Sequence, residues 1–158
     1  MTGPVQPDAE SQGICKANPA NLKDIILAAG SSTDSSYAMQ FDIPGHYSAL
    51  ADMDLFVDAK KILDKKGHPF HMGNIVSSDI FYDFDKENWK KWAKLNVLAV
   101  EMESYALYIN AAYLGKKALT MLTVTDHFIK EGRLTPEQRQ TGLRNMIDSA
   151  IDLAEKYA

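Results

Sequence analysis

The stretch NVLAVEMESYALYINAAYLGKKALTMLTVTDHF, from Asn96 to Phe128, decides how this chain folds. It begins with the apolar run Val97 to Val100, which has no polar alternation and predicts a strand covered on both faces. From Met102 to Tyr113, apolar residues recur at spacings of three and four, which indicates one apolar face of a helix. A second apolar run, Ala118 to Val124, predicts another strand. The stretch therefore predicts a strand, helix, strand unit.

Carboxylates follow both predicted strands. Glu101 and Asp126 come directly after the first and second strands, and Glu103 falls in the first turn of the helix. Because parallel strands joined by a helix have their carboxyl ends at one edge of the sheet, we expect these three acids to converge where open α/β sheets bind ligands. The structural alternative is that Glu103 is an ordinary acid of a first helical turn and that strand-end acids only cap a loop.

Composition restricts the classes of function. The chain has 158 residues, a net charge of −4 and no basic cluster, which argues against nucleic acid or an anionic membrane and favours small molecules or protein subunits as partners. No apolar run is long enough to span a bilayer and no signal peptide follows Met1, so we expect a cytoplasmic protein. A single cysteine excludes an internal disulfide, and four histidines without helical ligand spacing predict no metal site.

The rest of the chain alternates strands and helices, which is typical of an α/β domain. Residues 1–20 are expected to form an irregular arm and residues 21–158 one domain. The predicted elements are a strand at 22–29, a serine-rich loop at 31–36, an amphipathic helix at 51–66 ended by Gly67, a strand at 70–78 and a short charged helix at 86–94. Asp58 is expected on the solvent face of the amphipathic helix.

The last predicted helix begins at Thr135, where Pro136 and Gln138 complete a capping box. Arg139 precedes Leu143 by four residues, so it lies on the apolar side, in a first turn where the helix dipole disfavours a cation. This placement predicts an anionic partner for Arg139.

Five segments together resemble the nucleoside phosphorylase family, and in particular the bacterial hexameric purine nucleoside phosphorylases. They are Tyr47–Leu55, Gly73–Tyr82, Val100–Ser104, Thr123–His127 and Glu137–Thr141, in the family's order and spacing. Pyrimidine-specific relatives share the Glu-Met-Glu element but lack the Ser/Thr-Asp-His step, whereas nucleosidases that hydrolyse methylthioadenosine share both. The last segment favours the purine phosphorylases. The resemblance runs from Leu22 to the C-terminus and implies a three-layer α/β/α domain, truncated at the N-terminal side relative to the family.

The resemblance also implies a role for particular residues. Asp126 corresponds to the family's general acid, and Arg139 to the arginine that helps it deliver its proton. Glu103 would accept hydrogen bonds from the ribose hydroxyls, with Met102 packed on the sugar. The residues that the resemblance places around base and ribose are Phe81, Val100, Glu101, Met102, Glu103 and Thr125. Cleaving the glycosidic bond leaves negative charge on the base, which the acid must meet while phosphate attacks the ribose.

No cofactor is implied, and inorganic phosphate is the expected co-substrate. Family members have a longer N-terminal part that supplies a phosphate loop and residues for the neighbouring subunit. This chain lacks that part, and where the family has a Val-Gly-Ser/Thr-Cys-Gly strand end the segment Glu10–Cys15 retains only fragments of the pattern. We therefore expect a homo-oligomer or a complementing subunit, since an α/β sheet that lacks strands exposes an edge and an apolar face.

Three functions remain open from the sequence. The first is phosphorolysis of purine ribo- or deoxyribonucleosides in nucleoside salvage, alone or with a complementing chain. The second is a catalytically inactive fragment that binds purines or subunits, which the missing phosphate loop favours. The third is a purine nucleosidase that uses water, whose activating base would also fall in the missing N-terminal part.

Overall fold

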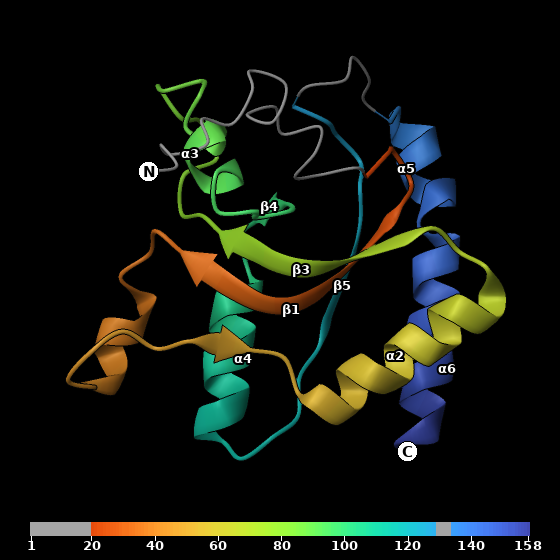
Figure 1. The fold of residues 1–158 in the computed structure, drawn as a ribbon, viewed down its shortest axis with the longest axis horizontal. Helices are drawn as coiled ribbons and strands as arrows, with labels where there is room; N and C mark the ends of the chain where they lie inside the picture. The colour runs from red at the N-terminus through yellow and green to blue at the C-terminus, as the bar shows by residue number, and fades with distance from the viewer. Residues whose placement is uncertain (1–19, 129–133) are drawn as a thin grey trace, which may run out of the picture.

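Strand β1 (Ile25–Thr33) is the centre of a mixed sheet in the computed structural model, which describes residues 20–128 and 134–158 (Figure 1). One edge of β1 pairs in parallel with β3 (Phe70–Ser77), whose end pairs in parallel with β4 (Val100–Glu101). The other edge pairs antiparallel with β2 (Ala49–Leu50) and with β5 (Thr120–Thr123). The predicted α/β class is confirmed. Apart from Ala20, the predicted arm lies outside the described residues.

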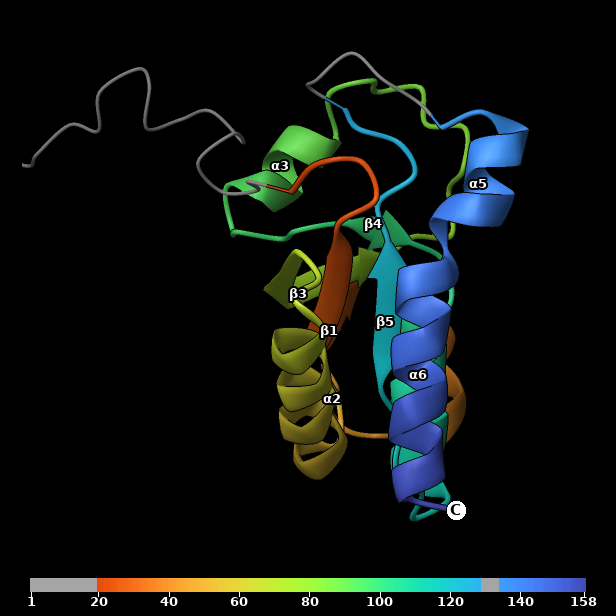
Figure 2. The same ribbon diagram turned by 90° about the vertical axis from the view of Figure 1, so that its right-hand side faces the viewer.

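Helices accompany this sheet on several sides. They are α2 (Met53–Lys66), α3 (Trp89–Ala93), α4 (Ser104–Tyr113), α5 (Pro136–Gly142) and α6 (Arg144–Lys156), with a short 3₁₀ helix, η2, at Tyr37–Phe41. Figure 2 shows α2 and α6 along the lower part of the sheet, with β1 and β5 behind them. None of the described helices is long and apolar enough to cross a membrane.

The core divides along β1 because successive side chains of a strand point to opposite faces. Leu27 is fully buried and packs with Ala59 of α2 and Leu153 of α6. Ile26 and Ala28 point to the other face, where they pack with Ala20, Ile75, Leu98, Ala99, Leu122 and Val124. Tyr105, Tyr108 and Ile109 of α4 form a third cluster with Ala49 and Ala51.

Local signals predicted several element boundaries correctly. The Asp52 side chain accepts a hydrogen bond from the Leu55 N–H at 3.0 Å and starts α2, and Gly67 ends the helix with φ of 69°. Gly115 follows α4 with φ of 61°, as its position predicted. The capping box between Thr135 and Gln138 is present at the start of α5.

Four expectations about elements were wrong. β1 continues through Ser31 to Thr33, because cross-strand hydrogen bonds satisfy the hydroxyls that favour a loop: Ser31 Oγ lies 3.0 Å from Ser77 Oγ, and Asn74 Nδ2 donates to Ser32 Oγ at 2.8 Å. The run Val97–Val100 is not a strand covered on both faces, since β4 contains only Val100 and Glu101 and Val100 is 45% exposed.

The other two wrong expectations concern the length of the last helix and the burial of Asp58. The last helix is divided at Leu143 into α5 and α6. Asp58 was expected to face solvent but is buried, because the C-terminal end of α6 packs over α2 and brings Lys156 and Tyr157 to its carboxylate at 2.6 and 2.8 Å.

Candidate functional site

The carboxylate of Glu101 caps the N-terminus of α4. Its Oε2 accepts hydrogen bonds from the backbone N–H groups of Glu103, at 2.8 Å, and Ser104, at 2.7 Å. Its Oε1 accepts from the Ser104 hydroxyl at 2.6 Å and from the Ser77 hydroxyl. Glu101 therefore stabilises the unpaired N–H groups and the dipole of this helix end.

Glu103 occupies the N-cap position of α4, but its side chain makes no capping hydrogen bond. It was expected inside the first helical turn, and the helix instead begins one residue later, at Ser104. The Glu103 carboxylate lies at the surface and accepts a 3.2 Å hydrogen bond from the Met102 N–H. This carboxylate thus stays exposed at the helix end, where a ligand hydroxyl can reach it.

A second polar group joins Asp126 to α5. Both carboxylate oxygens of Asp126 lie 3.1 Å from Nη2 of Arg139, and the Thr125 hydroxyl donates to Oδ2 at 2.9 Å. Arg139 Nε also donates to the Leu134 carbonyl at 3.3 Å. The anionic partner predicted for Arg139 is therefore present, although both side chains of the pair are more than two fifths exposed.

The expected convergence of Glu101 and Asp126 on one sheet edge does not follow from the observed topology. β4 runs parallel to β3 and hence to β1, whereas β5 runs antiparallel to β1. Glu101 is level with Ser77 and Thr33 at the C-terminal end of β1, while Thr123, which ends β5, is level with Ile25 at its N-terminal end. The strands that precede the two acids therefore end at opposite ends of the β1 and β3 ladder.

The remaining predicted substrate residues lie on the surface near the Glu101 end. Phe81 is 74% exposed and contacts the Tyr82 ring edge to face, with 4.9 Å between centroids. Val100 and Met102 are nearly half exposed. Exposed apolar side chains beside an exposed carboxylate are suited to contacting a flat base and a sugar.

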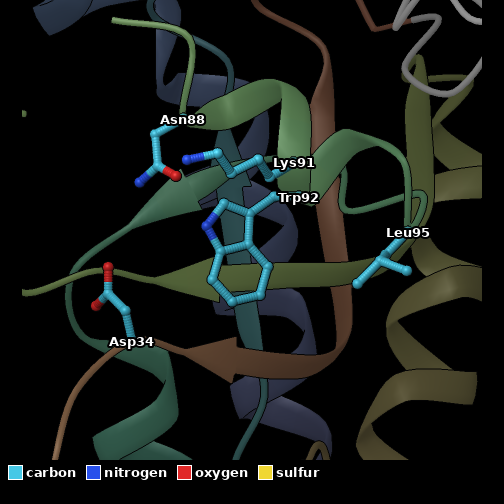
Figure 3. Close-up of a pocket in the computed structure, with 5 residues that line it drawn as sticks. All are labelled: Asp34, Asn88, Lys91, Trp92 and Leu95. Carbon is cyan, nitrogen blue, oxygen red and sulfur yellow. The ribbon is translucent and has the colours of Figure 1, made fainter. Parts of the chain in front are cut away.

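A shallow pocket of about 300 Å³ opens between α3 and the end of β1 (Figure 3). Its lining residues are Asp34, Asn88, Lys91, Trp92 and Leu95. The Asp34 carboxylate accepts hydrogen bonds from Ser78 Oγ at 2.7 Å and the Asp79 N–H at 3.0 Å. Lys91 pairs with Asp85 at 2.9 Å, which raises the pKa of Lys91. These polar groups serve the chain itself, and the pocket contains none of the predicted substrate residues.

Sequence reasoning missed the buried serine cluster formed by Ser31, Ser77 and Ser104. Its three hydroxyls lie 3.0 to 3.1 Å apart and are at most 5% exposed. Ser77 and Ser104 were read as parts of longer motifs and Ser31 as loop. The available signal was the position of Ser77 at the end of β3 and of Ser104 at the start of α4; Ser31 lies two residues before the end of β1.

Sequence reasoning also missed a contact of α3 with the segment after β5. The rings of Trp89 and Phe128 are stacked 5.8 Å apart with 6° between their planes.

Within residues 20–128 and 134–158, no cluster of His, Cys, Asp and Glu has the arrangement of a metal site.

Comparison with known proteins places these features in a family. The family model described as "Phosphorylase superfamily" matches residues 22–158. The chain belongs to the phosphorylase superfamily. This membership agrees with the resemblance in the sequence and with the mixed α/β sheet.

Individual members of the superfamily are similar over most of this chain. A DeoD-type purine nucleoside phosphorylase of Geobacillus sp. (strain WCH70) is 40% identical over 144 residues, which cover 90% of this chain and 61% of the relative. One from Alkaliphilus metalliredigens (strain QYMF) is 41% identical over 145 residues, 90% of this chain and 62% of the relative. One from Geobacillus kaustophilus (strain HTA426) is 38% identical over 152 residues, which cover 96% of this chain and 59% of the relative. The chain thus spans about three fifths of the length of these superfamily relatives.

Proposed function

We propose that the chain binds purine nucleosides and takes part in their phosphorolysis to free base and ribose or deoxyribose 1-phosphate. The observation that carries the proposal is the Asp126 and Arg139 pair, in a chain about 40% identical to purine nucleoside phosphorylases. A guanidinium beside a carboxyl group can help it to transfer a proton to the base as the glycosidic bond breaks. Inorganic phosphate is the proposed co-substrate, with no resident cofactor.

Glu103 is the proposed ribose ligand. Its carboxylate is at the surface and is not needed as the cap of α4, because Glu101 fills that role. Met102 would pack on the sugar, and Phe81, Val100 and Thr125 would line the base. Since the chain has a single cysteine, Cys15, we propose that it works in the reducing cytoplasm.

We further propose that the reacting site is completed between subunits, whether a second copy of this chain or a complementing chain. Asp126 follows a strand that ends at the opposite end of the β1 and β3 ladder from Glu101. If Glu103 came from one chain and Asp126 from a partner chain, one bound nucleoside would have the Glu103 carboxylate at its ribose and the Asp126 acid at its base.

Release of free base from inosine and adenosine, measured with and without phosphate, tests the activity. Phosphate-dependent release supports phosphorolysis. Release that is independent of phosphate indicates a nucleosidase and overturns the proposal. Purine binding without release indicates the second candidate, a binding fragment, which the separation of the two acids favours.

Mixing two inactive variants tests whether copies of the chain share a site. Asp126→Asn and Glu103→Ala are each purified and assayed alone, then mixed and assayed again. If the site forms between two copies, mixing restores a fraction of the activity, because some interfaces then contain both native groups. Activity that stays at the level of the separate variants excludes a site shared between copies.

A further inference from the structure

The Glu101 carboxylate already uses its full capacity to accept hydrogen bonds. Two bonds come from backbone N–H groups, of Glu103 and Ser104, and two from hydroxyls, of Ser77 and Ser104. An ionised carboxylate offers about four acceptor positions on its two oxygens. Glu101 therefore has no remaining position for a hydrogen bond from a nucleoside.

The hydrogen bonds around Glu101 have a fixed direction. A backbone N–H can only donate, and the Tyr105 N–H donates to Ser77 Oγ at 2.8 Å, so the Ser77 hydrogen is free to point to Glu101. Ser104 donates to the same oxygen of Glu101. Ser31 Oγ lies 3.0 Å from both Ser77 Oγ and Ser104 Oγ, accepts a hydrogen bond from Ser104, and donates to the Ser32 carbonyl at 3.1 Å. The network thus connects β1, β3 and α4 to the carboxylate of Glu101.

We propose that Glu101 is a positioning residue, and that the serine network holds it so that Met102 and Glu103 are presented to the ribose. This inference rests on the proposed function, in which Glu103 is the ribose ligand. The 2.8 Å bond from the Glu103 N–H to Glu101 fixes the backbone of that ligand. Buried, fully satisfied networks of this kind hold a single arrangement of their members.

Ser104→Ala is the primary test because it removes one donor to Glu101 without adding bulk. Loss of one hydrogen bond to a charged group is expected to weaken nucleoside binding about tenfold, while the affinity for the free base stays within about twofold. Isothermal titration with inosine and with hypoxanthine measures both. Ser31→Ala should have a smaller effect, since the hydrogen bonds of Ser31 are linked to Glu101 through Ser77 and Ser104.

Ser149→Ala is the matched control. Ser149 is as buried as Ser104 but donates to the Asn145 carbonyl within α6, so its loss should change neither affinity. Equal losses for inosine and hypoxanthine in Ser104→Ala, or no loss for either, would contradict the positioning role.

Amide hydrogen exchange separates this inference from the proposed function. In Ser104→Ala the amides of Glu103 and Ser104 should exchange at least severalfold faster than in the native chain, whether or not a nucleoside binds. If the native chain binds no nucleoside, the proposed function fails, and faster exchange still supports the network. Unchanged exchange of both amides overturns the inference.

Discussion

At the scale of the residue, the Asp126 carboxylate is the group on which the proposed chemistry depends. It receives hydrogen bonds from Thr125 and Arg139, two residues separated from each other in sequence but joined through this acid. The proposed reaction requires it to exchange a proton, whereas binding of the base requires only its shape and polarity.

We therefore expect Asp126→Asn to lower the rate of base release about 100-fold or more, the range expected for loss of a general acid, with purine affinity changed only a fewfold. Steady-state kinetics and titration with hypoxanthine measure the two effects. Asp148→Asn, which alters an exposed acid of α6, is the control. An unchanged rate would remove Asp126 from the mechanism.

At the scale of the element, two long-range contacts hold helices to the sheet and to each other. Tyr108 of α4 is 1% exposed, and its hydroxyl donates to the Ala28 carbonyl at 2.8 Å and accepts from the Thr120 N–H at 3.0 Å. It therefore links α4 to β1 and β5. Burial raises the pKa of the Tyr108 hydroxyl, which keeps it protonated and able to donate.

Tyr108→Phe should lower the free energy of unfolding by about 1–3 kcal/mol, because it removes the hydroxyl that bonds both the Ala28 carbonyl and the Thr120 N–H. Urea unfolding followed by circular dichroism measures the difference. Tyr113→Phe, at a tyrosine that is 75% exposed, should change it little. Equal effects of both substitutions would contradict the role of the buried hydroxyl.

The second contact, between α2 and α6, predicts a pH dependence. Hydrogen bonds from Lys156 and then Tyr157 hold the pKa of Asp58 well below its ordinary value. Because the folded pKa is the lower one, the stabilisation is fully present above the unfolded pKa of about 4 and is lost progressively as the pH falls from that value through the folded pKa.

Asp58→Asn should accordingly lower the melting temperature clearly at pH 7 and less at pH 2.5, where part of the stabilisation has been lost. Thermal scans at both values measure this. Asp64→Asn, in the exposed pair with Lys60, is the control and should have a small effect at either pH. If Asp58→Asn lowers the melting temperature equally at both pH values, the charge of Asp58 is not the source of the stabilisation.

The sequence predicted those elements whose signals are local. The start of α2 at Asp52, its end at Gly67 and the capping box of α5 depend on residues within one turn, and these predictions were correct. The burial of Asp58 depends on residues about 100 positions further along the chain, so hydrophobic periodicity assigned it to the solvent face.

Strand direction could not be predicted for a related reason. The composition of the apolar run that forms β5 is compatible with parallel and with antiparallel pairing. Its direction is fixed only by how it pairs with β1 in the folded sheet. Ser31 was assigned to a loop because serine favours turns, and its partners Ser77 and Ser104 come from other elements. For the candidate site, the motifs identified the residues, but their relative placement depended on the sheet topology.

At the scale of the whole molecule, an apolar groove of about 330 Å³ lies between α2, α4, α6 and β5. Leu55, Leu107, Met121 and Leu153 are among its lining residues, and Ala150 opens into it from α6. Such a groove leaves apolar surface in contact with solvent in a single chain.

Ala150→Leu should raise the free energy of unfolding by about 1 kcal/mol, because the added methylenes leave water and enter the groove. Urea unfolding measures this, with Ala112→Leu on the exposed side of α4 as the control. A destabilised Ala150→Leu chain would contradict the expected filling of the groove.

The pairing of β1 has a consequence for synthesis of the protein on the ribosome. β1 is among the first described segments to be translated, yet the edge that receives β2 and β5 is complete only after residue 123 has left the exit tunnel. Until then, the nascent chain presents an apolar strand, IILAAGSST, with an open edge. Protection of that edge by a chaperone, or rapid elongation through α4 to β5, therefore favours the yield of folded protein over aggregation.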